Sequence, residues 1–440
     1  MKKDKIYLNL FFVYCFVLLI SCKGEKAEEK VKKGSETAET SSTIGQENKN
    51  NIEAAIRRDK LDGGPYPALL VTQSRFLPAD DGSGKNTKPG PARLLILRKK
   101  GNDWQKVIID DPDSNVFHKA MQMGNSILTA GATGAWLKLW TFNNGNWKSE
   151  TLWNPKFGGK FDRLRDFEIG RVMPGGMPQI TVATHDQGVV AVVVREGEKW
   201  KIIEIDKKPD TFVHEIELAD IDGDGINEIF ATPSMPNVLG KSQSGEIVMY
   251  KWKGKNFEKT LIKKFDTRHV KEILATTLKG EKKPVLFAAV EAELEKIADK
   301  TKIKTPVEIF RFSFDEKLKV TEDVVASIFD AQMRFLVEGD VDNDGKSELI
   351  ASAMKTGIWL IRPAPSLPWQ VTNFERESSG FEHATCLADL DKDGKPEIYV
   401  AADDQKELSM YTWNGSGFDK KLVIPLEGSV ITWNIMPGNI

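Results

Sequence analysis

The chain has 440 residues, with 62 Lys and Arg against 64 Asp and Glu and a formal net charge of -2. Hydrophobic residues make up 40% of it, which is an ordinary globular composition. This balance excludes a strongly basic nucleic-acid-binding protein and a highly charged disordered chain. It indicates no particular class of partner, and we expect no nucleic-acid partner.

Residues 1–22 have the organisation of a bacterial lipoprotein signal peptide. A basic start, residues 1–5, precedes an apolar run at residues 6–20, and the order Leu-Ile-Ser-Cys that ends at Cys22 resembles a lipobox. The apolar run is too short to cross a hydrocarbon core of ~30 Å as a helix. We therefore expect cleavage before Cys22 and lipidation of its thiol, which makes a membrane the first predicted partner.

Residues 23–58 are polar and charged, with few large apolar side chains. Such a segment cannot offset the entropy lost on ordering, so it predicts a flexible tether. The expected location is the bacterial cell envelope, anchored on the extracytoplasmic side. Lys23, rather than Asp, after the lipidated cysteine favours the outer membrane by analogy with lipoproteins. After processing, Cys386 is the only other thiol, so no intramolecular disulfide is expected.

The remainder, residues 59–440, contains an internal repeat of hairpins. Seven times an alternating apolar run is followed by a polar turn and a second strand-like run, from "LLILRKKGNDWQKVII" at residues 94–109 to "ELSMYTWNGSGFDKKLVI" at residues 407–424. Another pair of apolar runs precedes most of these hairpins. Four strands in each unit of about 40 to 60 residues are typical of propeller blades. The sequence therefore predicts an all-β fold, a seven-bladed β-propeller.

The first repeat lacks an innermost strand, and the last segment of the chain lacks a partner. Residues 63–74 begin directly with a second strand, whereas "VITWNIMPGNI" at residues 430–440 has no strand to follow it. We expect the C-terminal strand to complete the first blade. This pairing closes the ring and covers exposed strand edges.

One acidic pattern occurs three times between two apolar runs, first as "DIDGDGINE" at residues 220–228. Three Asp side chains at alternate positions converge, a Gly permits the sharp turn, and a Glu returns from the next strand. Hard cations such as Ca²⁺ take six to eight oxygen ligands. The shorter return to Glu distinguishes these loops from EF-hands. The predicted metal ligands are Asp220, Asp222, Asp224 and Glu228; Asp340, Asp342, Asp344 and Glu348; and Asp389, Asp391, Asp393 and Glu397.

These loops and hairpins resemble the FG-GAP and VCBS repeat families. The resemblance implies a seven-bladed propeller like the integrin alpha head, with structural Ca²⁺ held by the listed carboxylates and by backbone oxygens of Ile226, Lys346 or Lys395. Asp-Gly turns also occur in hairpins without any metal. The other repeats lack the acidic triplets, so their loops are expected to be metal-free.

A histidine precedes two of the acidic loops at the same distance. His214 lies six residues before Asp220, and His383 lies six residues before Asp389. Aligning the repeats by their second strands places an Arg or His at or beside this position in four others. A further histidine falls on a connection that opens on the same end. The predicted ligand-binding set at one mouth of the central channel is His118, Arg165, His185, His214, His269, Arg334 and His383.

Three chemistries fit such a ring. Arginine forks and protonatable histidines bind an anionic ligand, neutral histidines hold a transition metal, and one histidine serves as general base. The arginines would repel a metal ion, so the anionic ligand ranks first. The alternative is that these residues are exposed polar strand starts with no shared ligand. Longer connections open on the same face, and one of them, residues 291–306, has a helical composition.

Two classes of function remain. The sequence contains no Walker loop, nucleophile elbow, C-x-x-C or H-E-x-x-H motif. This favours a membrane-anchored calcium-binding propeller that acts as a ligand-binding or protein-interaction module. The alternative is an enzyme of the lyase or dehydratase type acting on sugars or sugar acids, because some VCBS-type propellers resemble such enzymes. The expected partner is a carbohydrate, an anionic small molecule or a protein.

Overall fold

The computed structural model describes residues 65–79, 87–159, 162–185, 187–236, 241–297 and 300–440. The predicted signal peptide and tether, residues 1–58, lie outside the described residues. The chain divides into two compact units, residues 1–57 with 77–88 and residues 58–76 with 89–440. Apart from residues 77–78 and 87–88, the sheets and sites below belong to the second unit. Within the described ranges there is no helix with the length and apolar character needed to span a membrane.

The described residues form strands and no helices. Nine strands make one sheet, and the others make five four-stranded sheets and one separate hairpin. The strands of the nine-stranded sheet are β1 (Pro67–Pro78), β2 (Thr87–Pro89), β3 (Ala92–Lys100), β4 (Asp103–Asp111), β5 (Val116–Met123), β6 (Ser126–Ala132), β7 (Trp136–Asn143), β8 (Asn146–Trp153) and β31 (Ser429–Asn439).

The four-stranded sheets follow one another along the chain, each with antiparallel neighbours. They are β9 (Leu164–Gly170), β10 (Gln179–Thr184), β11 (Val190–Glu196) and β12 (Lys199–Asp206); β13 (Phe212–Ala219), β14 (Glu228–Ser234), β15 (Gly245–Trp252) and β16 (Phe257–Phe265); β17 (Val270–Thr276), β18 (Val285–Val290), β21 (Val307–Phe314) and β22 (Val320–Ile328); β23 (Met333–Gly339), β24 (Glu348–Ala353), β25 (Gly357–Arg362) and β26 (Gln370–Glu375); and β27 (Thr385–Ala388), β28 (Glu397–Ala402), β29 (Glu407–Trp413) and β30 (Phe418–Pro425).

The separate hairpin corrects one expectation. Residues 291–306, with their helical composition, instead contain β19 (Glu293–Ile297) and β20 (Lys300–Thr305), which pair with each other. Alternating side chains such as Leu294 and Ile303 meet across this pair. Cross-strand pairing therefore overrides the helical propensity of the Glu, Ala and Lys residues.

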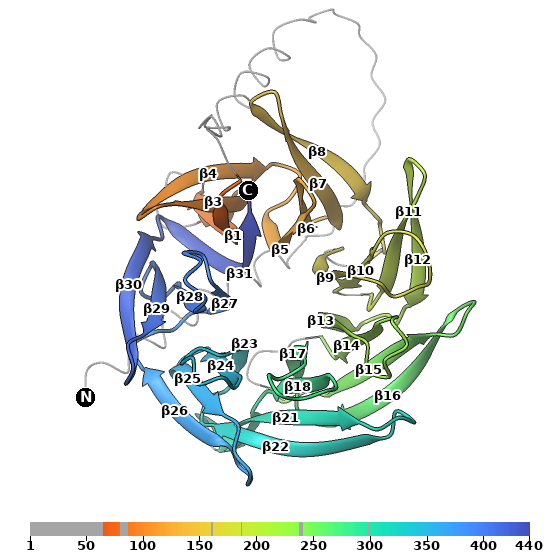
Figure 1. Ribbon diagram of the computed structural model, residues 1–440. Helices are drawn as coiled ribbons and strands as arrows, with labels where there is room; N and C mark the ends of the chain where they lie inside the picture. Colours follow the sequence, from red (N-terminus) through yellow and green to blue (C-terminus); the bar gives the residue numbers. More distant parts are fainter. Residues whose placement is uncertain (1–64, 80–86, 160–161, 186, 237–240, 298–299) are drawn as a thin grey trace, which may run out of the picture. The chain divides into compact units, whose positions relative to one another are not determined.

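The sheets stand around a central opening, with the first strand of each four-strand group nearest to it (Figure 1). This arrangement is propeller-like. The predicted pairing of the chain ends is present, because β31 runs antiparallel to β1 from Pro67 opposite Asn439 to Phe76 opposite Ser429. Two backbone hydrogen bonds of 2.9 Å between Tyr66 and Ile440 extend the pairing to the last residue.

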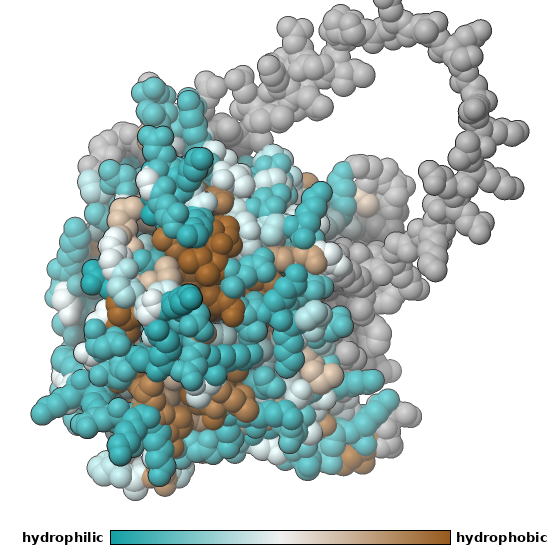
Figure 2. Space-filling view, turned by 90° about the vertical axis from the view of Figure 1, so that its right-hand side faces the viewer, coloured by the Kyte–Doolittle hydropathy of each residue, from teal (hydrophilic) through white to brown (hydrophobic). Residues whose placement is uncertain are grey.

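The core lies between adjacent sheets. The second strands β10, β14, β18, β24 and β28 are buried at every residue, because each has a strand on both sides and a sheet against both faces. Outer strands such as β16 are mostly exposed or half-buried. Their outer surface is mainly hydrophilic, with separate hydrophobic patches (Figure 2). The rings of Trp104 and Tyr399, which belong to neighbouring sheets, pack edge to face with their centroids 6.1 Å apart.

Candidate functional site

Six innermost strands carry a β-bulge at the same level. Their pairing register shifts there, which leaves one or two residues without a direct cross-strand partner. A bulge bends the strand and redirects a side chain, and this explains how polar residues at strand starts turn toward the axis. The bulged residues are His118, Arg165, His214 with Glu215, Lys271, Arg334 and Trp433.

Four of the predicted histidines form a continuous row. Successive ring centroids in the order His118, His185, His214 and His269 are 6.3, 4.8 and 6.2 Å apart. These side chains are at most 6% exposed. The alternative reading, in which they are exposed strand starts, is therefore wrong.

The row is neutral at neutral pH. Burial, and then the charge of Arg165, holds the pKa of His118 well below its usual value. Burial likewise lowers the pKa of His185 and His214 strongly, and that of His269 to about 4. His118 donates from Nδ1 to the carbonyl of Leu164 at 2.6 Å, so its Nε2 carries the lone pair.

The two predicted arginines are less available than the sequence implied. Arg334 pairs through Nη2 with Glu382, and Nη2 of Arg165 lies 3.5 Å from the same Glu382 oxygen. Glu382 itself is 2% exposed. Lys271 makes a similar pair with Glu291 at 2.8 Å. These internal partners reduce the charge that remains for an anionic ligand.

His383 does not join the row. Its ring lies within hydrogen-bond distance of Ser378 Oγ, at 2.7 Å, and of the Ala353 carbonyl, also at 2.7 Å. Among the described residues, no contact links His383 to the other six predicted ligand-binding residues. The physical reason is local: at φ 55° the backbone makes a turn here, before β27 begins.

A cavity of about 350 Å³ lies on the axis, because its lining comes from all seven strands nearest the opening, β5, β9, β13, β17, β23, β27 and β31. It contains predicted residues, His118 and Arg165, together with carboxylates that sequence reasoning missed. The ionisable residues that line this axial chamber are His118, Lys119, Arg165, Asp166, Glu168, Glu215, Glu217, Glu272 and Glu338.

Several chamber carboxylates connect neighbouring sheets. Asp166 accepts the backbone N–H of Ile216 at 2.8 Å, and Glu272 accepts that of Leu336 at 2.9 Å. Both donors belong to the innermost strand of the next sheet, which has no strand beside it on one edge, so these carboxylates satisfy backbone N–H groups on that edge. Asp166 also pairs with Lys119 Nζ at 2.9 Å. These residues therefore stabilise the ring as well as line the cavity.

Burial raises the pKa of three chamber carboxyl groups. Burial, and then repulsion by Asp166 and Glu272, raises the pKa of Glu215 well above its usual value. Burial is also the main cause that raises the pKa of Glu217 well above its usual value and that of Glu272 to about 8. Glu215 forms one weak ion pair, with Arg165 at 3.9 Å.

The acidic loops lie at the other end of the same innermost strands. In the last loop, oxygens of Asp389, Asp391, Asp393 and Glu397 all lie within 4.8 Å of one another. The other two loops gather three predicted ligands each, without Asp224 in one case and without Glu348 in the other. The clusters in these two loops are Asp220, Asp222 and Glu228, and Asp340, Asp342 and Asp344.

Local hydrogen bonds give these loops their shape. Asp220 accepts the backbone N–H groups of Gly223 at 2.8 Å and of Gly225 at 2.9 Å. Gly225 has φ 83°, a conformation that favours glycine. Glu228 closes the loop by accepting the N–H of Ile221 at 3.0 Å. The described turn between β9 and β10, expected to be metal-free, contains no acidic triplet.

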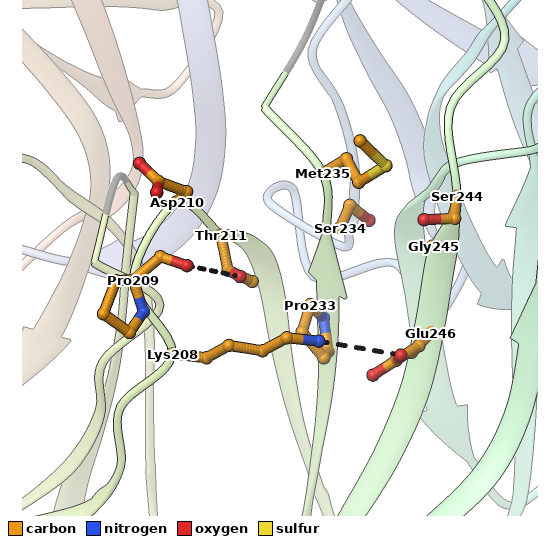
Figure 3. A pocket seen from close by; sticks show the side chains of 10 residues that line it. All are labelled: Lys208, Pro209, Asp210, Thr211, Pro233, Ser234, Met235, Ser244, Gly245 and Glu246. Atoms are coloured by element: carbon orange, nitrogen blue, oxygen red, sulfur yellow. Dashed lines mark hydrogen bonds and ion pairs between the residues drawn. The ribbon is translucent and has the colours of Figure 1, made fainter.

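A second cavity, of about 160 Å³, lies beside β14 and β15 (Figure 3). Lys208 and Glu246 form an ion pair of 3.7 Å across it, and Thr211 donates to the Pro209 carbonyl at 3.3 Å. None of the predicted site residues lines this cavity. The axial chamber, which is lined by His118 and Arg165, is therefore the stronger candidate site.

The comparisons define the class of fold. No protein-family model and no curated protein matches the sequence. A putative 6-phosphogluconolactonase from Bacteroides uniformis aligns over 84% of this chain and 99% of its own, with 12% identity and a TM-score of 0.52. A functionally unknown protein from Desulfotomaculum acetoxidans aligns over 84% and 99%, with 10% identity and a TM-score of 0.50.

A variant of apocarotenoid oxygenase from Synechocystis aligns over 86% of this chain and 94% of its own, with 11% identity and a TM-score of 0.49. At identities this low, a likeness concerns the fold alone. The first two similarities support an all-β, propeller-like protein. They add no evidence for FG-GAP or VCBS membership.

Proposed function

We propose that the chain is a seven-bladed β-propeller enzyme that performs acid-base chemistry on a small sugar or sugar acid in the axial chamber. The nine-stranded sheet counts as two blades, since its two four-stranded halves share only the pair of Ser74 and Val116. The observation that carries the function is the joint presence, in one cavity, of a protonated carboxyl, a neutral imidazole and buried cations.

Each group has a distinct role. Glu215 donates a proton, because burial keeps its carboxyl protonated. His118 accepts one at Nε2, since its Nδ1 is committed to Leu164. Arg165 and Lys119 attract a carboxylate or hydroxyl oxygens of the substrate. This set suits elimination next to a carboxylate, and equally the attack of water on a lactone.

The size of the chamber supports a small substrate. About 350 Å³ lies at the lower end of the usual range for small-molecule sites, roughly 300 to 1,000 Å³. The similar structure from Bacteroides uniformis is described as a putative 6-phosphogluconolactonase, which agrees with a sugar-acid substrate by analogy of fold. In this chain, the cations Lys119 and Arg165 in the chamber support a substrate with an acid group.

The remaining parts of the proposal concern the setting of the enzyme. We propose that Cys22 is lipidated, that the propeller faces the extracytoplasmic space of the cell envelope, and that the loops belong to the FG-GAP or VCBS type. Ca²⁺ fits the loop at residues 389–397 best, because four carboxylates converge there. Its role there is structural, because none of the four loop carboxylates lines the axial chamber.

The test is a substrate screen with a matched variant. Uronic acids, unsaturated uronides and aldonolactones are incubated with the protein, and products are followed by NMR. Glu215→Gln keeps the shape of the side chain but has no acidic proton, so turnover should fall about 10²- to 10⁴-fold. Glu246→Gln, in the second cavity, should leave turnover unchanged. Saturable binding with no turnover would instead support the binding-module function.

A further inference from the structure

The three acidic loops differ at one position of the third strand. Ile229 pairs with Tyr250, so Glu228 lies opposite Lys251. By the same register, Glu348 lies opposite Arg362, because Leu349 pairs with Ile361. Glu397 lies opposite Thr412, because Ile398 pairs with Tyr411. The third-strand residue opposite the loop Glu is therefore Lys251 in the first of these sheets, Arg362 in the second and Thr412 in the third. We call this position the slot of each loop.

Lys251 occupies the centre of the first loop. Its Nζ lies 2.7 Å from Asp222, 3.1 Å from Asp224 and 2.6 Å from Glu228. The side chain is 13% exposed, so the contacts are largely shielded from water.

Arg362 serves the second loop in a different way. Its Nε and Nη2 lie 3.2 and 2.8 Å from one oxygen of Asp342. Lys279 approaches from the neighbouring sheet and places Nζ 2.6 Å from Asp340. Two cations, Arg362 and Lys279, thus balance the carboxylates of the second loop.

In the third loop, the strand position opposite the Glu holds no cation. Thr412 is neutral, and among the described residues no Lys or Arg forms an ion pair with Asp389, Asp391, Asp393 or Glu397. Tyr399 donates its hydroxyl to Glu397 at 2.9 Å, which leaves the other Glu397 oxygen free for a ligand. This loop alone brings all four predicted carboxylates together.

We infer that Lys251 and Arg362 are internal cations that replace a metal ion in two of the three acidic loops. Ca²⁺ binds oxygen at about 2.3 to 2.6 Å, and Nζ of Lys251 already lies 2.6 to 3.1 Å from the same carboxylates. A metal ion cannot enter while the ammonium is there, because the two would overlap and repel. The sequence-based expectation of three equivalent calcium sites is thereby reduced to one, at residues 389–397.

Binding stoichiometry tests the inference directly. Protein treated with EGTA is dialysed against CaCl₂, and bound calcium is measured by atomic emission. The wild type should hold at most one ion per chain. Lys251→Thr, which copies the slot of the third loop, should gain one ion, and Thr412→Lys should lose the ion of that loop. Lys263→Thr is the control, because Lys263 forms its ion pair with Glu322 of the next sheet, at 2.6 Å, and not with a loop carboxylate.

Thermal unfolding provides a readout independent of enzymatic activity. EGTA should lower the Tm of Lys251→Thr more than that of the wild type, and it should leave Thr412→Lys unchanged. Two or three ions in the wild type would overturn the inference. So would a folded Lys251→Thr protein that gains none. If Lys251→Thr does not fold, the wild-type stoichiometry and Thr412→Lys decide. None of these results depends on turnover in the axial chamber, so the proposed function stands or falls separately.

Discussion

The Nε2 atom of His185 lies 3.2 Å from Nδ1 of His214, so the two imidazoles share one hydrogen bond in the middle of the histidine row. One ring donates and the other accepts, which requires at least one of them to be neutral. The outer nitrogens of the pair, Nδ1 of His185 and Nε2 of His214, have no hydrogen-bond partner among the described residues. Protonation of either ring therefore places a charge in a buried position without a carboxylate acceptor.

Acid should destabilise the protein through this pair. Burial holds the pKa of His185 and His214 well below the unfolded value of about 6.5. Below that pH the unfolded state binds more protons than the folded state, so stability falls as the pH drops. His214→Gln removes one titrating ring. The difference in unfolding free energy between the variant and the wild type should therefore become smaller from pH 7.5 to pH 5. Urea unfolding at several pH values measures it, and a constant gap would contradict the prediction.

Removing Trp433 should weaken the closure of the ring. Its indole is 9% exposed, packs against His118 at a centroid distance of 4.7 Å and donates to Ser74 at 3.0 Å. Trp433→Ala leaves a cavity beside the paired strands β31 and β1. We expect a loss of about 3 to 5 kcal/mol in the free energy of unfolding. Phe329→Ala is the control, because that side chain is 71% exposed. Equal effects of both changes would argue against the closure.

Replacing Cys22 should prevent anchoring. Lipidation needs the thiol, so Cys22→Ser should leave an uncleaved or soluble precursor. Labelling of growing cells with a radioactive fatty acid, followed by fractionation, measures the effect. Cys386→Ser is the control, because that thiol is buried in the propeller-like unit and should not be labelled. Label that persists on the Cys22→Ser protein would exclude this residue as the anchor.

The acidic loops could be predicted because their ligands are close in sequence. Alternate Asp residues and a Gly turn specify a local shape, and the structure brings Asp389, Asp391, Asp393 and Glu397 together as the spacing indicated. The internal cation Lys251 could not be found by spacing, since it lies on another strand. Its position follows only when the pairing register is known.

The histidine row was partly predictable, and the bulges explain the remainder. A bulge adds one residue to one strand, so alignment of repeats by sequence shifts by one position. In β17 the bulged residue is Lys271, whereas the alignment placed His269 beside the shared position. Glu382, which precedes the predicted His383, is the residue that faces the arginines. The closing strand could be predicted from the order of the repeats. The first repeat lacked an innermost strand and the last segment lacked a partner, so the two were expected to pair.

The last prediction concerns Glu382. Its carboxylate serves two buried guanidiniums, those of Arg165 and Arg334, which are 8% and 7% exposed. Glu382→Gln keeps the volume of the side chain but removes its negative charge. The two buried guanidiniums then lack the carboxylate that neutralised them. Breaking a buried ion pair in this way costs roughly 3 to 5 kcal/mol. By the same reasoning, replacing His214 and Arg334 together by Ala should destabilise the fold.

A double-mutant cycle separates the ion pair from simple loss of packing. Arg334→Met removes the cation that depends most on Glu382, so the change in unfolding free energy of Arg334→Met with Glu382→Gln should be smaller than the sum of the two single changes. Arg165 is then left with Glu215 at 3.9 Å as its remaining acidic neighbour. Urea unfolding at pH 7.5 gives the coupling energy. Additive effects would mean that the Arg334 and Glu382 side chains act independently, and that neutralisation by Glu382 is not what keeps Arg334 in the interior.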